Sequence, residues 1–200
     1  MSKLSEKKVI AITGTMGSGK SKVSEILSHS FPVIDCDRIN ELLLKKGNEG
    51  YFALISKPYI HLLENGEIDK VAMSKTMFTD KKIKNEIESI LHPLIFSEID
   101  CWVKAQRKDY VFVEVPLLFE IQAQNHFDQV WCVVCDEEIA LSRLQKYRQI
   151  SSQEAKRRIR TQMSVEEKVK RSQVVINNNG TVEQLREKVM AALERMGIWC

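Results

Sequence analysis

The stretch Gly14-Thr15-Met16-Gly17-Ser18-Gly19-Lys20-Ser21 decides the fold, because it fits the pattern G-x-x-x-x-G-K-[ST] at every defined position. A short, mostly β-branched apolar run at residues 9–13 precedes it, and Val23, Ile26 and Leu27 follow it at helical spacing. Strand, glycine-rich loop and helix in this order predict a P-loop, in which backbone N–H groups and a helix N-terminus surround a polyphosphate.

The residue types in this loop suit phosphate chemistry. We expect the backbone of residues 14–19 to cradle the phosphates of a nucleotide, Lys20 to reach the β- and γ-phosphates, and the Ser21 hydroxyl to ligate Mg²⁺. The alternative is a glycine-rich loop that matches by chance, and the flanking strand and helix argue against it.

The whole chain has the composition of a globular protein. Its 200 residues suit one domain or one core with insertions, and 44% hydrophobic with 28% charged residues is ordinary. No apolar run reaches the length of a membrane span, and residues 1–8 lack the apolar segment of a signal peptide. We therefore expect a cytoplasmic protein without a membrane partner.

Five cysteines do not predict a disulfide framework, since their number is odd and the expected compartment is reducing. Cys132 and Cys135 form a C-x-x-C pattern, but the pattern lies in an apparent strand, where residues three apart point to opposite faces. The sequence therefore predicts buried thiols there rather than a metal or redox site.

The net charge of +3 is too small to indicate a nucleic-acid partner, and Tyr147 is the only aromatic residue in the basic segment at residues 143–171. That segment holds ten basic and three acidic residues, a local charge of +7. Such a charge beside a P-loop suggests a cover over phosphates, although a solvated helical face explains about half of it.

The remaining pattern alternates between strands and helices. Residues 38–106 read as a helical insertion with a turn at Asn65-Gly66, and a closing amphipathic helix follows the last strand. We predict an α/β fold with a doubly wound five-stranded parallel sheet, in which ligands bind beyond the carboxyl ends of the strands. The expected strands are residues 9–13, 33–35, 110–115, 130–135 and 173–176.

Acidic residues stand at the ends of two expected strands. Asp35 and Asp37 would share a face of an extended segment and point at the phosphate site, or Asp37 would only N-cap a helix that starts at Arg38. Glu114, inside an apolar strand, is expected in the Mg²⁺ shell, with a structural hydrogen bond as the alternative. For Glu120 a similar role stays open, with a helix-start acid as the alternative.

A small helical lid is expected within the basic segment. Arg143 lies on the helix after the fourth strand, and the next helix, near residues 152–163, opens with a possible capping box from Ser151 to Glu154. Arg158 and Gln162 share one face of this helix. Arginines on a mobile helix suit a lid that closes over ATP and excludes water.

Segments spread over nearly the whole chain resemble those of one family, the dephospho-CoA kinases. They are Ile12-Thr13-Gly14 with the P-loop, Val33-Ile34-Asp35-Cys36-Asp37, Asn65-Gly66-Glu67-Ile68-Asp69, Met77-Phe78-Thr79-Asp80, Leu91-His92-Pro93-Leu94-Ile95, Val115-Pro116-Leu117-Leu118-Phe119-Glu120, Arg158-Ile159 with Gln162, and Ile176-Asn177-Asn178-Asn179-Gly180.

That resemblance implies a P-loop kinase that uses ATP and Mg²⁺ to phosphorylate the ribose 3′-hydroxyl of dephospho-CoA, giving CoA and ADP. It implies a nucleotide-binding core (residues 1–37, 110–142 and 172–200), a helical CoA-substrate domain (38–109) and a lid (143–171). We expect a monomer or a weak homo-oligomer.

The resemblance also implies site roles. Asp37 would be the catalytic base or orienting residue, with Lys20 and Arg143 as further catalytic residues. The other roles are Asn179 and Gly180 near the adenine of ATP; His92, Pro116 and Leu117 on the acceptor side; Arg148, Arg158 and Gln162 in the lid; and Ser21, Asp35 and Glu114 around the metal. For His92, a helix-packing role before Pro93 is as good an interpretation as contact with the acceptor.

Two departures from the family pattern concern these roles. Glu114 stands where Asp is common, and Tyr147 stands where a lid arginine is frequent, with Arg148 as a possible substitute. The alternatives are a P-loop kinase for a nucleoside, nucleotide or sugar acceptor, and a P-loop ATPase that drives a partner. The segment at residues 115–120 and His92-Pro93 argue against the first, and the lack of recognisable sensor or switch elements argues against the second.

Overall fold

The computed structural model describes residues 7–198 and forms two compact units. One unit holds the residues up to Asp35 together with those from Gln106 onward, and the other is Cys36–Ala105. Residues 1–6, which include most of the polar N-terminus, and Cys200 lie outside the described residues.

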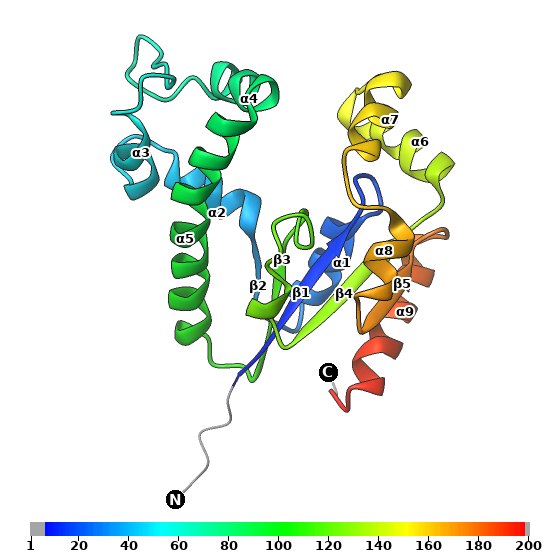
Figure 1. The fold of residues 1–200 in the computed structure, drawn as a ribbon. Coiled ribbons are helices and arrows are strands. Elements are labelled where there is room, and N and C mark those ends of the chain that lie inside the picture. The colour runs from blue at the N-terminus through cyan, green and yellow to red at the C-terminus, as the bar shows by residue number, and fades with distance from the viewer. Residues whose placement is uncertain (1–6, 199–200) are drawn as a thin grey trace, which may run out of the picture. The chain divides into compact units, whose positions relative to one another are not determined.

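The first unit is built on a five-stranded, all-parallel sheet with strand order β2-β3-β1-β4-β5 (Figure 1). Its strands are nearly continuous apolar runs, as expected where both faces of a parallel sheet are covered. This confirms the predicted five-stranded parallel sheet. The strands are β1 (Lys8–Gly14), β2 (Val33–Asp35), β3 (Tyr110–Glu114), β4 (Gln129–Val134) and β5 (Val174–Asn177).

Helices cover both faces of this sheet. On one face, α1 (Lys20–Ser28) and α9 (Val182–Arg195) form a common core with alternate residues of the strands, and within this core Phe112 packs edge-on against Phe31 and Trp131. On the other face, α8 (Val165–Lys170) contacts β4. The fold is therefore a doubly wound α/β fold, as predicted.

Three further helices lie after the third strand. They are the short 3₁₀ helix η1 (Gln124–His126), α6 (Glu137–Arg148) and α7 (Ser152–Arg160). The predicted lid, residues 143–171, thus takes in the second half of α6 together with α7 and α8, and it belongs to the same compact unit as the sheet.

Helix α7 starts at Ser152 as predicted, but its capping box and its end differ from the prediction. Ser151 caps the helix by accepting a hydrogen bond from the Glu154 N–H. The Glu154 carboxylate does not complete a capping box; it pairs with Arg157 and Arg158 instead, because charge-assisted bonds at i+3 and i+4 compete with the backbone. The helix ends at Arg160, before the predicted end near residue 163.

The second unit is helical, as predicted for the insertion. It contains α2 (Cys36–Leu43), α3 (Glu49–Leu54), α4 (Lys70–Thr79) and α5 (Lys81–Ala105), which runs unbroken through Pro93. The predicted Asn65-Gly66 turn lies inside one isolated antiparallel bridge between Leu62 and Ile68. The buried core of this unit is Leu44, Tyr51, Leu54, Ile60, Ile68, Met73, Ile87 and Leu91.

Candidate active site

The P-loop connects the last residue of β1, Gly14, to the first residue of α1, Lys20. Gly19 caps the helix with a φ of +96°, a left-handed conformation that glycine adopts without a Cβ penalty. The Lys20 side chain is buried and folds back over the loop, where Nζ donates to the carbonyl oxygens of Gly14 at 3.1 Å and Thr15 at 3.0 Å. The loop therefore holds a cation among its backbone groups, as phosphate binding requires.

Two side chains from other elements brace this loop. Asn178, buried just after β5, donates from Nδ2 to the Ser18 carbonyl at 2.8 Å. Arg143 of α6 donates to the same carbonyl at 3.5 Å and to Asn178 Oδ1 at 3.4 Å. A Cβ on Gly19 would lie 2.1 Å from Asn178 Nδ2, so the loop and this amide fit together only with glycine.

Asn178 was missed by sequence reasoning, which selected Asn179 and Gly180 from the same polar run. The available signal was a run of three asparagines directly after the last apolar strand. Asn179 instead accepts from the Asp136 N–H at 2.8 Å, and Gly180 lies next to Thr181, the capping residue of α9. Their predicted place near adenine is not tested by these contacts.

Glu114 is the last residue of β3 and only 5% exposed. Its two carboxylate oxygens accept hydrogen bonds from two hydroxyls of α1, Ser21 Oγ at 3.0 Å and Ser24 Oγ at 2.7 Å. The two interpretations of Glu114 are therefore compatible, since its hydrogen-bond donor is the predicted metal ligand Ser21. Ser24 was missed, although its position one helical turn after Ser21 was a signal.

The electrostatics around Glu114 favour a nearby positive charge. Burial raises the pKa of Glu114 above its ordinary value, the hydrogen bond from Ser24 opposes this, and the charge of Asp35 raises the pKa further. Asp35 is the β2 residue paired with Glu114 in the sheet register. A cation between these two strand ends would relieve both the desolvation and the repulsion.

The residues present fit a Mg²⁺ ion that arrives with a nucleotide. Within residues 7–198, no group of three or more His, Cys, Asp or Glu side chains could hold a metal ion by itself. The predicted set of Ser21, Asp35 and Glu114 offers one hydroxyl and two carboxylates. Mg²⁺ commonly binds one or two carboxylates plus substrate phosphates and waters, so this set suits Mg²⁺ on a nucleotide.

The local structure at Asp37 differs from both expectations. Strand β2 ends at Asp35 and α2 begins at Cys36, so Asp37 lies in the first turn of a helix. It neither shares an extended face with Asp35 nor caps a helix that starts at Arg38. The chain changes from strand to helix within one residue, which a period-two argument cannot anticipate. The catalytic role of Asp37 stays a prediction.

The predicted lid residues have different surroundings. Gln162 lies just beyond α7, and its Oε1 accepts a hydrogen bond from the Met16 N–H of the P-loop at 2.9 Å. Arg158 pairs with Glu154 at 2.6 Å on the exposed side of α7. Arg148 is the exposed last residue of α6. The structure therefore joins the lid segment to the P-loop through Gln162.

The predicted acceptor-side residues lie on two different elements. Pro116 and Leu117 occupy the turn after β3, where the Pro116 carbonyl accepts a hydrogen bond from buried Thr13 and Leu117 is 41% exposed. His92 lies in the middle of α5, half-buried, and burial lowers the pKa of its imidazole. Burial fits the helix-packing role of His92 without testing contact with an acceptor.

The cysteine prediction is confirmed for the described residues. Cys132 within β4 and Cys135 just after it are buried free thiols. Burial raises the pKa of both thiols, so neither is a ready nucleophile. Cys135 Sγ lies 3.7 Å from the Gly17 carbonyl and packs under the P-loop.

Comparison with known proteins identifies the family. The family model described as "Dephospho-CoA kinase" matches residues 8–184. The chain is 37% identical over 192 residues to the dephospho-CoA kinase of Carboxydothermus hydrogenoformans, covering 94% of this chain and 93% of that one.

Two solved structures are similar in fold. TT1252 from Thermus thermophilus matches with a TM-score of 0.84 and 29% identity, covering 96% of this chain and 98% of that chain. The dephospho-CoA kinase from Campylobacter jejuni matches with a TM-score of 0.62 and 26% identity, covering 95% and 97%. Because the family model takes in the P-loop, the whole helical unit and the lid segment, this chain belongs to the dephospho-CoA kinase family of P-loop kinases.

Proposed function

We propose that this protein transfers the terminal phosphoryl group of ATP to the ribose 3′-hydroxyl of dephospho-CoA, giving CoA and ADP, the last step of CoA biosynthesis. The observation that carries the proposal is the family match over residues 8–184. It spans both the phosphate-binding loop and the complete Cys36–Ala105 unit, whereas a shared P-loop alone would leave the acceptor open.

On the nucleotide side, the chain supplies a preorganised cradle. The Lys20 ammonium and the P-loop amides bind the phosphates, while Asn178 and Arg143 hold the loop in shape. Ser21, Asp35 and Glu114 are the groups that would hold Mg²⁺, and Glu114 also accepts the hydrogen bond of the Ser21 hydroxyl. When bound with ATP, Mg²⁺ neutralises charge on the phosphates during transfer.

On the acceptor side, Asp37 orients the ribose 3′-hydroxyl and takes its proton. Asp37 lies in the first turn of α2, and a carboxylate is a suitable proton acceptor for a substrate hydroxyl. In this proposal the helical domain at residues 38–109, with His92, Pro116 and Leu117, binds dephospho-CoA, and Asn179 and Gly180 lie near the adenine of ATP.

Water must be kept from the reacting phosphoryl group, because it competes with the acceptor hydroxyl. We assign this task to the lid at residues 143–171. Gln162 seats it on the P-loop, and Arg148 and Arg158 supply exposed cations for the phosphates. Arg158 would exchange its bond to Glu154 for a phosphate contact.

The proposal also covers the location, the oligomeric state and the partners of the protein. No helix within residues 7–198 is both long enough and apolar enough to span a membrane. We propose a cytoplasmic enzyme that acts as a monomer or weak homo-oligomer, with no nucleic-acid or membrane partner.

The deciding experiment measures Mg²⁺-ATP consumption with and without dephospho-CoA, and mass spectrometry of the acceptor. Acceptor-dependent turnover with a product heavier by one phosphoryl group is the expected result. ATP loss without an acceptor product would indicate an ATPase. Turnover only with a nucleoside, nucleotide or sugar would indicate a different small-molecule kinase.

A further inference from the structure

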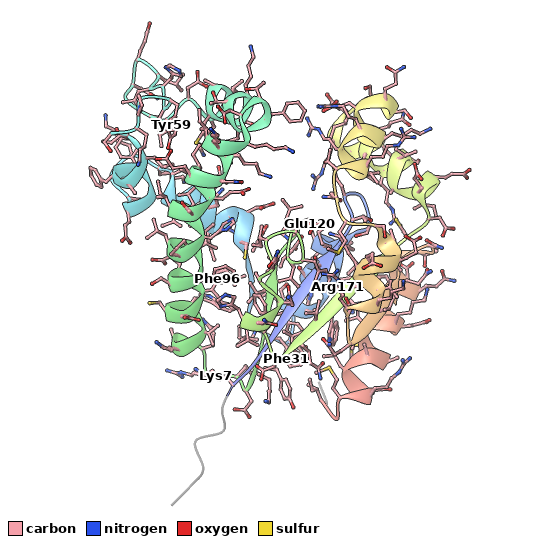
Figure 2. All side chains as sticks on the ribbon, in the orientation of Figure 1. Lys7, Phe31, Tyr59, Phe96, Glu120 and Arg171 are labelled. Carbon is pink, nitrogen blue, oxygen red and sulfur yellow. The ribbon has the colours of Figure 1, made fainter. Side chains whose placement is uncertain are left out.

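A buried ion pair lies outside the residues assigned to the reaction. Lys168 of α8 is fully buried, and its Nζ lies 2.8 Å from Glu120 Oε1. Glu120, labelled in Figure 2, comes from the loop after β3. This loop forms turns rather than a helix, so the interpretation as a helix-start acid is wrong, and the carboxylate serves a long-range contact instead.

The same carboxylate oxygen also holds the lid backbone. Glu120 Oε1 accepts a hydrogen bond from the Met163 N–H at 2.9 Å. The neighbouring residue, Gln162, accepts from the Met16 N–H of the P-loop at 2.9 Å. Because consecutive Cα atoms are only about 3.8 Å apart, fixing Met163 restricts where the Gln162 side chain can reach.

The local sequence places the two contacts on either side of Ser164, the N-cap of α8. Ser164 caps this helix by accepting from the Glu167 N–H, and its carbonyl accepts from the Lys168 N–H at 3.1 Å. Met163 therefore directly precedes the cap residue Ser164, and Lys168 follows Ser164 one helical turn later. Helix α8 is thus held by the buried Lys168 ammonium, and it fixes the position of the residues that precede it, Gln162 and Met163.

Stability alone does not account for the buried pair of Glu120 and Lys168. A buried ion pair often contributes no net stability relative to apolar side chains of the same size, whereas removal of one partner leaves an uncompensated charge. Within residues 7–198, neither Lys168 Nζ nor Glu120 Oε2 makes a hydrogen bond of ordinary geometry. Their mutual contact is therefore what holds the Glu120 carboxylate in place for Met163.

We propose that Glu120 and Lys168 are positioning residues for phosphoryl transfer. Their buried contact fixes the Met163 amide and thereby seats Gln162 on Met16, which sets the lid against the P-loop. Neither residue touches a substrate in this proposal; both act through Gln162. The kinetic part of the proposal rests on the proposed function, and the structural part does not.

The test uses the full chain with single variants Glu120→Gln, Lys168→Met and Gln162→Leu and the double variant Glu120→Gln/Gln162→Leu. Gln153→Leu and Lys156→Met are matched controls, because both are exposed residues of α7 in the same segment. Two quantities are measured: amide hydrogen exchange of residues 161–163 in the free protein, and kcat and KM for ATP together with ATP hydrolysis in the absence of acceptor.

The expected result is that amide exchange at residues 161–163 is faster than in the wild type in all three single variants. In the two controls it should equal the wild-type rate. We expect kcat/KM for ATP to fall roughly tenfold to a hundredfold, with a larger share of ATP lost to water. The double variant should be no worse than the more affected single variant, because Glu120 acts only through the contact of Gln162 with Met16, which Gln162→Leu already removes. Multiplying losses would overturn the proposal, as would wild-type exchange at residues 161–163.

Two further comparisons separate a folding defect from a positioning defect, and the positioning role from the proposed function. If a single charge removal prevents folding, Glu120→Gln/Lys168→Met buries no unpaired charge and should fold, still with fast exchange at residues 161–163; wild-type exchange in it would reject the proposal. Exchange needs no acceptor. A wild-type protein that fails to phosphorylate dephospho-CoA would therefore refute the proposed function, while the exchange comparison would still decide the positioning role.

Discussion

The Asn178 side chain donates a 2.8 Å hydrogen bond to the Ser18 carbonyl, joining the end of β5 to the P-loop across 160 positions of sequence. Asn178 is 6% exposed, so water cannot replace this bond at low cost. The shape of the phosphate-binding loop therefore depends on a residue just after the last strand of the sheet as well as on its own glycines.

We predict that Asn178→Asp weakens ATP binding. The change replaces the N–H donor with an oxygen that faces the Ser18 carbonyl, and an unmatched buried acceptor costs about 1–3 kcal/mol. Titration calorimetry should show a loss of affinity of roughly tenfold or more. Asn177→Asp is the control, since Asn177 Oδ1 accepts from the Asn179 N–H and aspartate still accepts. An equal loss of ATP affinity in both variants would contradict the role of Asn178 in supporting the P-loop.

Gly19→Ala should abolish nucleotide binding, because the new Cβ would meet Asn178 Nδ2 in a left-handed backbone conformation. Gly47→Ala is a matched control: its φ is +92°, close to the +96° of Gly19, but nothing lies within 4 Å of the added Cβ. Both variants carry backbone strain of about 1–2 kcal/mol, measurable by denaturant unfolding. Only Gly19→Ala should lose ATP binding. ATP binding retained in Gly19→Ala would show that the P-loop can shift away from Asn178 without loss of function.

Ser21→Ala and Ser24→Ala remove equivalent hydrogen bonds to Glu114 and should separate structure from catalysis. Each is expected to lower the free energy of unfolding by about 1.5–3 kcal/mol, as for bonds to a charged group. Turnover measured against Mg²⁺ concentration should collapse in Ser21→Ala alone, because Ser21 is the one of these two serines that is assigned to the metal. A similar Mg²⁺ dependence in both variants would remove Ser21 from that assignment.

Asp37→Asn should lower kcat far more than ATP affinity. Loss of a proton acceptor typically reduces the rate about 10²–10⁴-fold, while the P-loop contacts of ATP are unaffected. Steady-state kinetics with dephospho-CoA, together with calorimetry of ATP binding, make the comparison. Asp69→Asn, at the cap of α4, controls for loss of a carboxylate in the same unit. Wild-type kcat in Asp37→Asn would rule out the catalytic role.

Helix α7 should lose stability in acid. Hydrogen bonds from Arg157 and Arg158 lower the pKa of Glu154 from its ordinary value of 4.5 to about 2. A lowered folded-state pKa stabilises the fold above the unfolded-state value, and this stabilisation disappears as the pH falls from about 4.5 toward 2. The protection factors of the α7 amides, which are corrected for the intrinsic slowing of exchange in acid, should therefore fall across that window. Glu154→Gln should show no such change; an identical pH profile in this variant would contradict the prediction.

The strands and the phosphate loop were predictable because their signals are local. The apolar run at residues 9–13 became Lys8–Gly14, and the run at residues 130–135 became Gln129–Val134, each within two residues of the prediction. Apolar runs bounded by polar residues identify buried parallel strands without reference to their partners. The order of the strands, by contrast, depends on which edges pair.

The site residues found only in the structure share a different property. Asn178, Ser24 and the pair of Glu120 with Lys168 all act through contacts between distant segments. An asparagine after a strand or a lysine on a charged helix has many possible partners, and no spacing rule selects one. The strand-to-helix change at Cys36 was missed for a different reason: it occurs within one residue, which is too short for a periodic pattern to show.

The sequence by itself determined the P-loop, the alternation of strands and helices, and the family, because these depend on residue types at short, regular spacing. Only the tertiary structure decided which side chains support the loop: Asn178 and Arg143 at Ser18, Ser21 and Ser24 at Glu114, and Gln162 at Met16. Burial is the physical reason. A polar group acquires a specific partner when folding removes it from water, and that partner is chosen by the packing of elements far apart in the chain.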